Sequence, residues 1–149
     1  MEWVSSLRGQ VVGIDTAPVI YYIERNPRYI DLMHAFFQEV SRGECAVVTS
    51  VMTWLEGLVI PTRVGNRDLI RQYYDLLFYT RGITTYSLFP NTAKEAARLR
   101  AFHNIRTPDS IQMATAIIGG ASIFLTNDIR LPSLPGLKTL VLENLRKDL

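Results

Sequence analysis

The sequence predicts one α/β domain whose central, mainly parallel sheet is flanked by helices. Short apolar runs that suit buried strands alternate with longer stretches of helical periodicity. The connections between them are short, as in repeated strand–helix–strand units. The chain has 149 residues, of which 48% are hydrophobic, so it can bury a core and is not expected to be disordered. We therefore expect a single domain over residues 1–149.

The first strand is expected at 11–14, where VVGI leads directly into Asp15. We place this wholly apolar run at the centre of the sheet. Asp15 or Thr16 can cap the helix that follows, and the Asn-Pro pair at 26–27 breaks that helix. A second helix is expected over about 29–42. Its inward-facing residues should be Leu32, Met33, Phe36, Phe37 and Val40.

The next unit is a second strand at 46–49, followed by a helix that Ser50 can cap. Glu56 falls within the apolar positions of this helix, and Pro61 and Gly65 are expected to interrupt it. The apolar positions are Val51, Met52, Leu55, Leu58 and Val59.

A fourth helix is expected to start after Asn66, and a third strand is expected over 83–88. Thr92 and Glu95 have the S/T-x-x-E spacing of a capping box. This pair predicts a fifth helix that runs to about Phe102.

The stretch from Thr107 to Asp128 has the clearest local signals. Thr107 can act as an N-cap, with Pro108 at the first helical position and Asp109 in the first turn. Two glycines end this helix, and the apolar run 122–126 then suits a buried strand that leads into Asp128. A last strand at 137–142 precedes a polar tail, ENLRKDL.

Composition excludes several classes of protein. No apolar run approaches the roughly 18 residues of a membrane span, and the N-terminus lacks the apolar core of an export signal. Cys45 is the only cysteine, which excludes an internal disulfide and a cysteine zinc cluster and suits a reducing cytoplasm. The net charge of +2 is too small to indicate nucleic-acid binding. The glycine-rich phosphate loops GxGxxG and GxxxxGK[ST] are absent.

Four acidic residues occupy structurally special positions. Asp15 and Asp128 each follow a predicted strand, while Asp109 opens a helix and Glu56 lies among apolar residues on another. If the sheet brings them to one edge, a cation must compensate their like charges. Carboxylates without Cys or nearby His favour Mg²⁺ or Mn²⁺, which can activate water and stabilise charge on a phosphodiester. The pattern therefore predicts metal-dependent phosphodiester hydrolysis.

Each acid also has a purely structural interpretation. Asp15 can be a helix cap, and Asp109 can simply complement a helix dipole. Asp128 belongs to an ordinary Asn-Asp turn, and Glu56 can lie on a solvated stripe. Only the joint pattern of the four supports a metal site.

Basic side chains near the acids are candidates for binding substrate. Arg106 and Arg130 each lie close to a proposed ligand and can pair with phosphate. His34 and His103 are the only histidines, and they have no neighbouring acidic motif. A solvated or capping role is expected for both histidines.

Four segments resemble the motif blocks of the PIN domain. They are GIDTAPVIYYIE (13–24), TSVMTWLEGLV (49–59), TPDSIQMATAII (107–118) and FLTND (124–128). Together they span nearly the whole chain, and their spacing is most similar to that of VapC-type toxins. The TND block and the PD-x-x-x-x-A-T-A block are the more specific ones.

The resemblance implies a Mg²⁺- or Mn²⁺-dependent endoribonuclease, the toxin of a type II toxin–antitoxin pair, on a parallel sheet with flanking helices. It implies an RNA substrate, a cognate antitoxin as partner, a homodimer and a cytoplasmic location without a membrane. Residues beside the metal would also contact substrate. The implied metal ligands and catalytic residues are Asp15, Glu56, Asp109 and Asp128, and the adjoining positions are Thr16, Thr126 and Asn127.

The sequence departs from the family pattern in two places. Many members carry a further acid soon after TND, but Ile129, Arg130 and Leu131 follow here, so no fifth acidic ligand is expected. The segment PTRVG at 61–65 is expected to interrupt a region that often stays helical in relatives, and to reshape the entrance of the site.

Two other functions remain open from the sequence. A PIN-like fold can bind RNA or a protein without cutting, although the presence of all four acids argues against this. A different Mg²⁺ enzyme, such as a phosphatase or a DNA nuclease, is a third possibility. The second acid of a DxD phosphatase pair is missing, because Thr16 and Ala17 follow Asp15.

Overall fold

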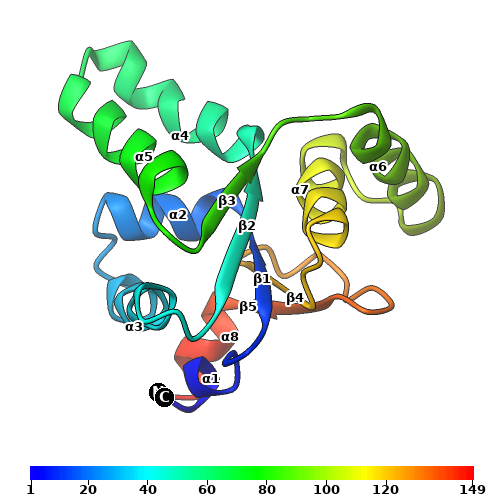
Figure 1. Ribbon diagram of the computed structural model, residues 1–149, viewed down its shortest axis with the longest axis horizontal. Helices are drawn as coiled ribbons and strands as arrows, with labels where there is room; N and C mark the ends of the chain where they lie inside the picture. The colour runs from blue at the N-terminus through cyan, green and yellow to red at the C-terminus, as the bar shows by residue number, and fades with distance from the viewer.

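The computed structural model describes residues 1–149, and its centre is a sheet of five parallel strands in the order β3-β2-β1-β4-β5 (Figure 1). This confirms the predicted fold class and places the first strand at the centre of the sheet. The strands are β1 (Val11–Ile14), β2 (Ala46–Ser50), β3 (Ile83–Tyr86), β4 (Ile123–Thr126) and β5 (Lys138–Val141).

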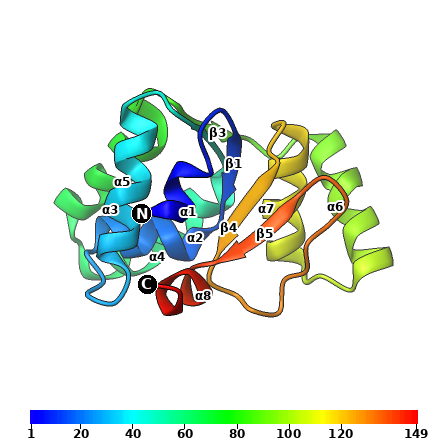
Figure 2. The same ribbon diagram turned by 90° about the horizontal axis from the view of Figure 1, so that it is seen from below.

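Helices cover both faces of this sheet (Figures 1 and 2). One face carries α2 (Thr16–Ile23), α3 (Ile30–Ser41), α4 (Val51–Val64) and α5 (Arg67–Tyr79), with the short helices α1 (Glu2–Ser5) and α8 (Leu142–Lys147). The other carries α6 (Pro90–His103) and α7 (Thr107–Ile118). Helix α8 lies where a polar tail was expected, and its first residue is buried. None of the helices is long and apolar enough to cross a membrane.

Two apolar cores lie on opposite faces of the sheet, because successive strand residues point to opposite sides. Val12 and Ile14 of β1 belong to the larger core, with the buried residues of α3. The five inward-facing residues predicted for that helix are all buried. Phe124 of β4 belongs to the smaller core, beneath α6 and α7.

Gly13 sets how closely α7 can approach the sheet. A Cβ atom at this position would lie 2.4 Å from the Cβ of Ala116 and 3.2 Å from Cδ1 of Phe124. We expect Gly13→Ala to lower the free energy of unfolding by about 1–3 kcal/mol, because the added methyl overpacks this contact. Urea unfolding measures the change.

The reciprocal variant tests the cause of this loss. Gly13→Ala combined with Ala116→Gly removes the Cβ–Cβ contact, so the double variant should lose less stability than the two single variants added together. Strictly additive losses would show that the contact with Ala116 is not responsible.

The prediction that Pro61 interrupts a helix is wrong. Helix α4 continues through Pro61 to Val64 and ends at Gly65, whose φ of 69° is left-handed. A proline N lacks the hydrogen that would bond to the Gly57 carbonyl. Pro61 is buried, and we attribute the continuity of the helix to the packing of its ring, which offsets the lost hydrogen bond.

The inward face of α4 also differs from the prediction. The buried positions are Thr53, Gly57 and Pro61, one turn apart, whereas Leu55 and Val59 are 59% and 46% exposed. A Cβ at Gly57 would lie 2.8 Å from the ring of Tyr73, so small residues on this face let α5 approach closely. Leu55, Val59 and Ile60 are therefore exposed to solvent, whereas Leu58 packs against the larger core.

Two predicted helix caps are wrong, one by three residues and the other by one. Helix α6 begins at Pro90, so Thr92 lies inside the first turn and is buried instead of capping, while Glu95 pairs with Arg98. Helix α7 has Arg106 at its N-cap position, and Thr107 is its first residue. In both helices a proline in the first turn fixes φ and permits this earlier start.

Candidate active site

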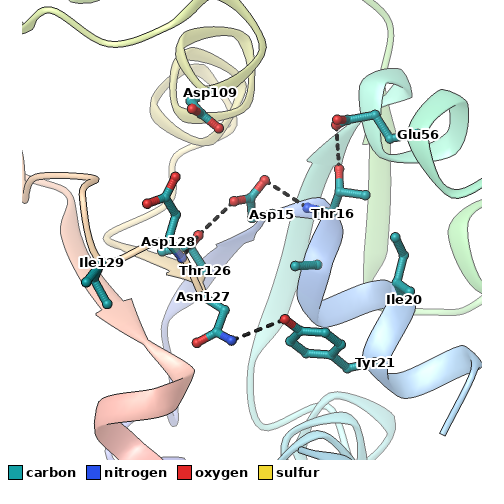
Figure 3. Close-up of a pocket in the computed structure, with 11 residues that line it drawn as sticks. Asp15, Thr16, Ile20, Tyr21, Glu56, Asp109, Thr126, Asn127, Asp128 and Ile129 are labelled. Atoms are coloured by element: carbon teal, nitrogen blue, oxygen red, sulfur yellow. Dashed lines mark hydrogen bonds between the residues drawn. The ribbon is translucent and has the colours of Figure 1, made fainter. Parts of the chain in front are cut away.

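A cavity of about 530 Å³ opens at the carboxyl ends of β1 and β4 (Figure 3). The structure brings all four predicted acids to its wall. The three predicted neighbours of the acids line it as well. These seven residues are Asp15, Thr16, Glu56, Asp109, Thr126, Asn127 and Asp128. Arg106 and Arg130 do not line this cavity and lie at a smaller adjoining one.

The sheet register explains why segments distant in sequence meet here. β1 and β4 are parallel neighbours with Ile14 opposite Leu125, so both strands end at the same edge. Asp15 directly follows β1 and caps α2, and Asp128 lies two residues beyond β4. Asp109 comes from the first turn of α7 and Glu56 from α4. In Figure 3 the carboxylates of the three aspartates point into the same space, and Glu56 approaches from the other side of Thr16.

Asp15 is held by two hydrogen bonds. Its Oδ1 accepts from the Thr16 backbone N at 2.8 Å, and its Oδ2 accepts from Thr126 Oγ1 at 2.7 Å. Burial raises the pKa of Asp15 to about 6, against the effect of these bonds, and the charges of Asp109 and Glu56 add to the rise. The acids are therefore close enough to repel one another.

This raised pKa predicts a pH-dependent stability for the metal-free protein. The unfolded pKa is lower than the folded one, so ionising Asp15 destabilises the fold progressively as pH rises from about 4 to about 6. The loss is complete above that range and reaches at most about 3 kcal/mol. In Asp15→Asn this contribution is absent. Urea unfolding in EDTA should show the stability difference between variant and wild type growing in favour of the variant over that window, whereas parallel pH profiles would contradict the prediction.

Arginines neutralise the two acids on the α7 side of the cavity. Arg130 binds Asp128 bidentately, with Nη2 2.8 Å from Oδ2 and Nε 3.0 Å from Oδ1. This guanidinium holds the pKa of Asp128 below its usual value. Arg106 Nη2 lies 3.5 Å from Oδ2 of Asp109. In the metal-free protein these cations partly offset the repulsion among the acids.

A buried glutamine that the sequence interpretation missed links the helices that carry the acids. Gln112 lies on α7, one turn after Asp109, and is 3% exposed. Its Nε2 donates to Thr16 Oγ1 at 3.0 Å and to Thr53 Oγ1 at 2.8 Å. Its Oε1 accepts from Ser50 Oγ at 2.8 Å. The available signal was the one amide side chain in the helix that follows Arg106.

The donors and acceptors of this network have one consistent assignment. Thr49 donates to the Ile14 carbonyl, so Thr53 is the donor in its bond to Thr49. Thr16 accepts from Gln112, which leaves its own hydroxyl hydrogen for Glu56 Oε1 at 2.8 Å. The glutamine thus orients the hydroxyl that holds Glu56.

Asn127 connects the cavity to the end of the chain. Its Nδ2 donates to the Tyr21 hydroxyl at 3.2 Å, and its Oδ1 accepts from the Glu143 backbone N at 2.9 Å. Glu143 also binds Arg28, and this pairing lowers the pKa of Glu143 well below its usual range. The predicted turn residue therefore anchors α8 beside the cavity.

The donor set suits a hard divalent cation. Four carboxylates and two threonine hydroxyls line the cavity, and neither cysteine nor histidine does. In the present arrangement no three acidic or other ligating side chains stand close enough together to hold an ion. Three of the carboxylates are instead turned toward threonine or arginine partners at hydrogen-bond distance. The chemistry and the placement of the acids fit Mg²⁺ or Mn²⁺. Each threonine bonds to one carboxylate oxygen and leaves the other available to a metal, whereas Arg130 occupies both oxygens of Asp128 and would have to yield.

Comparisons with known proteins identify the same fold. Residues 12–137 match the family model of the PIN domain. No curated protein matches the chain.

Solved structures of toxin–antitoxin proteins resemble the chain. VapBC2 from Rickettsia felis, bound to a promoter DNA fragment, has a TM-score of 0.68 at 15% identity, covering 88% of this chain and 98% of that one. A toxin–antitoxin complex from Klebsiella pneumoniae has a TM-score of 0.60 at 18% identity, covering 85% and 94%. Mycobacterium tuberculosis VapC20, a toxin that cleaves the sarcin–ricin loop, has a TM-score of 0.60 at 10% identity, covering 76% and 86%. At these identities the likeness shows a shared fold.

Proposed function

This chain belongs to the PIN-domain family, and we propose that it is a metal-dependent endoribonuclease that acts as the toxin of a type II toxin–antitoxin pair. The observation that carries the proposal is the gathering of four carboxylates around one cavity at the carboxyl edge of the sheet. A purely structural role as a cap, dipole partner, turn residue or solvated surface residue explains each acid separately. It does not explain why four elements deliver an acid to the same space.

The residues have distinct roles in the proposed reaction. Asp15, Glu56, Asp109 and Asp128 would hold Mg²⁺ or Mn²⁺. When bound, the metal supplies an activated water and stabilises charge on the phosphodiester. Thr126 keeps the Asp15 carboxylate directed into the cavity, and Thr16 does the same for Glu56. Thr16, Thr126 and Asn127 line the wall against which the RNA backbone would lie.

Cleavage assays with three substrates test this proposal. Purified protein is incubated with structured RNA, single-stranded DNA and a phosphomonoester, each with Mn²⁺, Mg²⁺ or EDTA. We expect cuts in RNA alone, and only with metal. Preferential cutting of DNA or hydrolysis of the monoester would favour another Mg²⁺ enzyme. No cutting, together with no heat of Mn²⁺ binding by calorimetry, would favour a non-catalytic binding module.

The proposed partner is an antitoxin protein, and the proposed assembly contains a homodimer. Support comes from the exposed apolar side chains on the outer side of α4 and α5, since large contiguous apolar surfaces mark interaction sites. These side chains are Leu55, Val59, Ile60, Val64, Tyr74, Phe78 and Tyr79. Light scattering of the purified chain tests for the homodimer. Co-purification with the product of the adjacent gene tests for the antitoxin. The free, buried Cys45 fits the proposed cytoplasmic location.

A further inference from the structure

The cavity lined by the four carboxylates is called the acidic cavity below. A second, smaller cavity of about 150 Å³ adjoins it and has a different chemical character. Asp109 and Asp128 form walls of both cavities. The remaining polar residues of the smaller cavity are nitrogen-rich: His103, Asn104, Arg106 and Arg130. We call it the basic cavity. It lies where α6 ends, at the left-handed Asn104, and where the chain leaves β4.

The two arginines of the basic cavity keep unused hydrogen-bond donors. Arg130 uses Nε and Nη2 for Asp128, and Arg106 uses only Nη2 for Asp109. A guanidinium has five N–H donors, so each group retains several. Both arginine side chains are 68% exposed. The free donors are therefore accessible to a ligand.

The ion pairs Arg106–Asp109 and Arg130–Asp128 can be exchanged for pairs with another anion at a small cost in free energy. The arginine of each pair is largely exposed, so solvent screens its charge, although the side chains of Asp109 and Asp128 are only 15% and 21% exposed. A divalent cation among the acids would compete with each guanidinium for the same carboxylate and would repel it. A phosphate offers the freed guanidinium an equivalent bidentate partner. The arginines can therefore change partners without a large penalty.

We propose that the basic cavity binds the RNA phosphate next to the one that is cut, and that Arg130 and Arg106 pass from Asp128 and Asp109 to this phosphate when metal occupies the acids. The inference rests on the proposed nuclease function. The shared walls place the two phosphates on one continuous path, as a polynucleotide requires. Because binding linkage is reciprocal, metal should strengthen RNA binding and RNA should strengthen metal binding.

Removing Arg130 should change the affinities for metal and for RNA in opposite directions. Loss of a purely structural salt bridge would not have this effect. In Arg130→Gln, Mn²⁺ affinity measured by calorimetry without RNA should rise about threefold to tenfold, because a competing cation is gone. Affinity for a short single-stranded RNA, measured by fluorescence anisotropy with Ca²⁺ in place of Mn²⁺ and with RNA integrity checked on a gel, should fall about tenfold. The slope of log affinity against log salt concentration should become shallower by about 0.7, the value for one phosphate contact to a single strand.

A matched variant controls for the loss of one positive charge. Arg98→Gln removes an exposed arginine that pairs with Glu95 on α6 and does not line the basic cavity. It should leave Mn²⁺ affinity and the salt slope as in wild type. If Arg130→Gln and Arg106→Gln behave like Arg98→Gln, the basic cavity is not a phosphate site. A wild-type protein that neither cuts nor binds RNA would instead refute the nuclease function, and this inference with it.

Discussion

Replacing Asp15 with asparagine is expected to reduce metal-dependent RNA cleavage by about 100-fold or more, with the fold intact. Asp15 lines the acidic cavity, and in Figure 3 it lies between Asp128 and Glu56. The variant removes one negative charge from the proposed metal site and leaves a side chain of nearly the same shape. Losing one preorganised electrostatic group in an enzyme site typically costs about 10²–10³ in rate. Initial cleavage rates of RNA at saturating Mn²⁺ measure the effect.

The fold should tolerate this change. An asparagine Oδ1 can still accept one of the hydrogen bonds that Thr126 and the Thr16 backbone N donate. Burial disfavours the ionised form of Asp15 in the wild type, as its raised pKa indicates. The asparagine variant buries no ionised group at this position and avoids this cost. Circular dichroism and urea unfolding should therefore show a folded protein at neutral pH.

A second aspartate provides the control for this variant. Asp31 lies in the first turn of α3, is exposed and does not line the acidic cavity. Asp31→Asn makes the same chemical change, so it should cleave RNA at the wild-type rate. If Asp15→Asn retains full activity beside this control, the assignment of the acidic cavity as the active site is wrong.

The parts of the site that lie at strand ends could be predicted from sequence. An apolar run followed by an acid, as at Ile14-Asp15, locates a strand end and its side chain together. Parallel pairing then brings all such ends to one edge, because every parallel strand runs the same way. This is why the cavity contains Asp15 and Asp128 as expected. The first turn of α7 was found within one residue by its proline.

Features that depend on packing between elements could not be predicted in this way. The course of α4 through Pro61 is one example, because the burial of that ring comes from α4 packing and not from local propensity. The outward position of Leu55 is another, since hydrophobic periodicity does not reveal that Gly57 and Tyr73 form the contact. The pairing of Arg130 with Asp128 depends on side-chain directions in a turn. Sequence spacing alone leaves these directions open.

Gln112 gives the second large expected effect, because it joins the elements that carry three of the acids. From α7 its amide bonds to Thr16, the neighbour of Asp15, and to Thr53 on α4, one turn before Glu56. We expect Gln112→Leu to weaken Mn²⁺ affinity and RNA cleavage by about 10–100-fold, as is typical when a group that orients metal ligands is lost. Calorimetry and cleavage rates measure the two effects.

The same variant should also lower stability, so a control must separate stability from positioning. Leucine removes the amide partner of Ser50, Thr16 and Thr53, and it leaves the buried Ser50 hydroxyl hydrogen without an acceptor, which costs about 1–3 kcal/mol. Thr53→Val breaks the branch of the network that leads to Thr49 on β2 but keeps the bond from Gln112 to Thr16. It should therefore lose stability while binding Mn²⁺ nearly as well as the wild type.

Gln112→Glu probes the amide itself, since glutamate keeps the shape but has no N–H to donate to Thr16 and Thr53. If Gln112 is a positioning residue, Gln112→Glu and Gln112→Leu should both lose Mn²⁺ affinity, and Thr53→Val should not, when all are compared under conditions where each is folded. If Mn²⁺ affinity instead follows unfolding free energy across the three variants, Gln112 serves only the stability of the fold. The orientation of Glu56 would then have to come from Thr16 alone, through its 2.8 Å hydrogen bond.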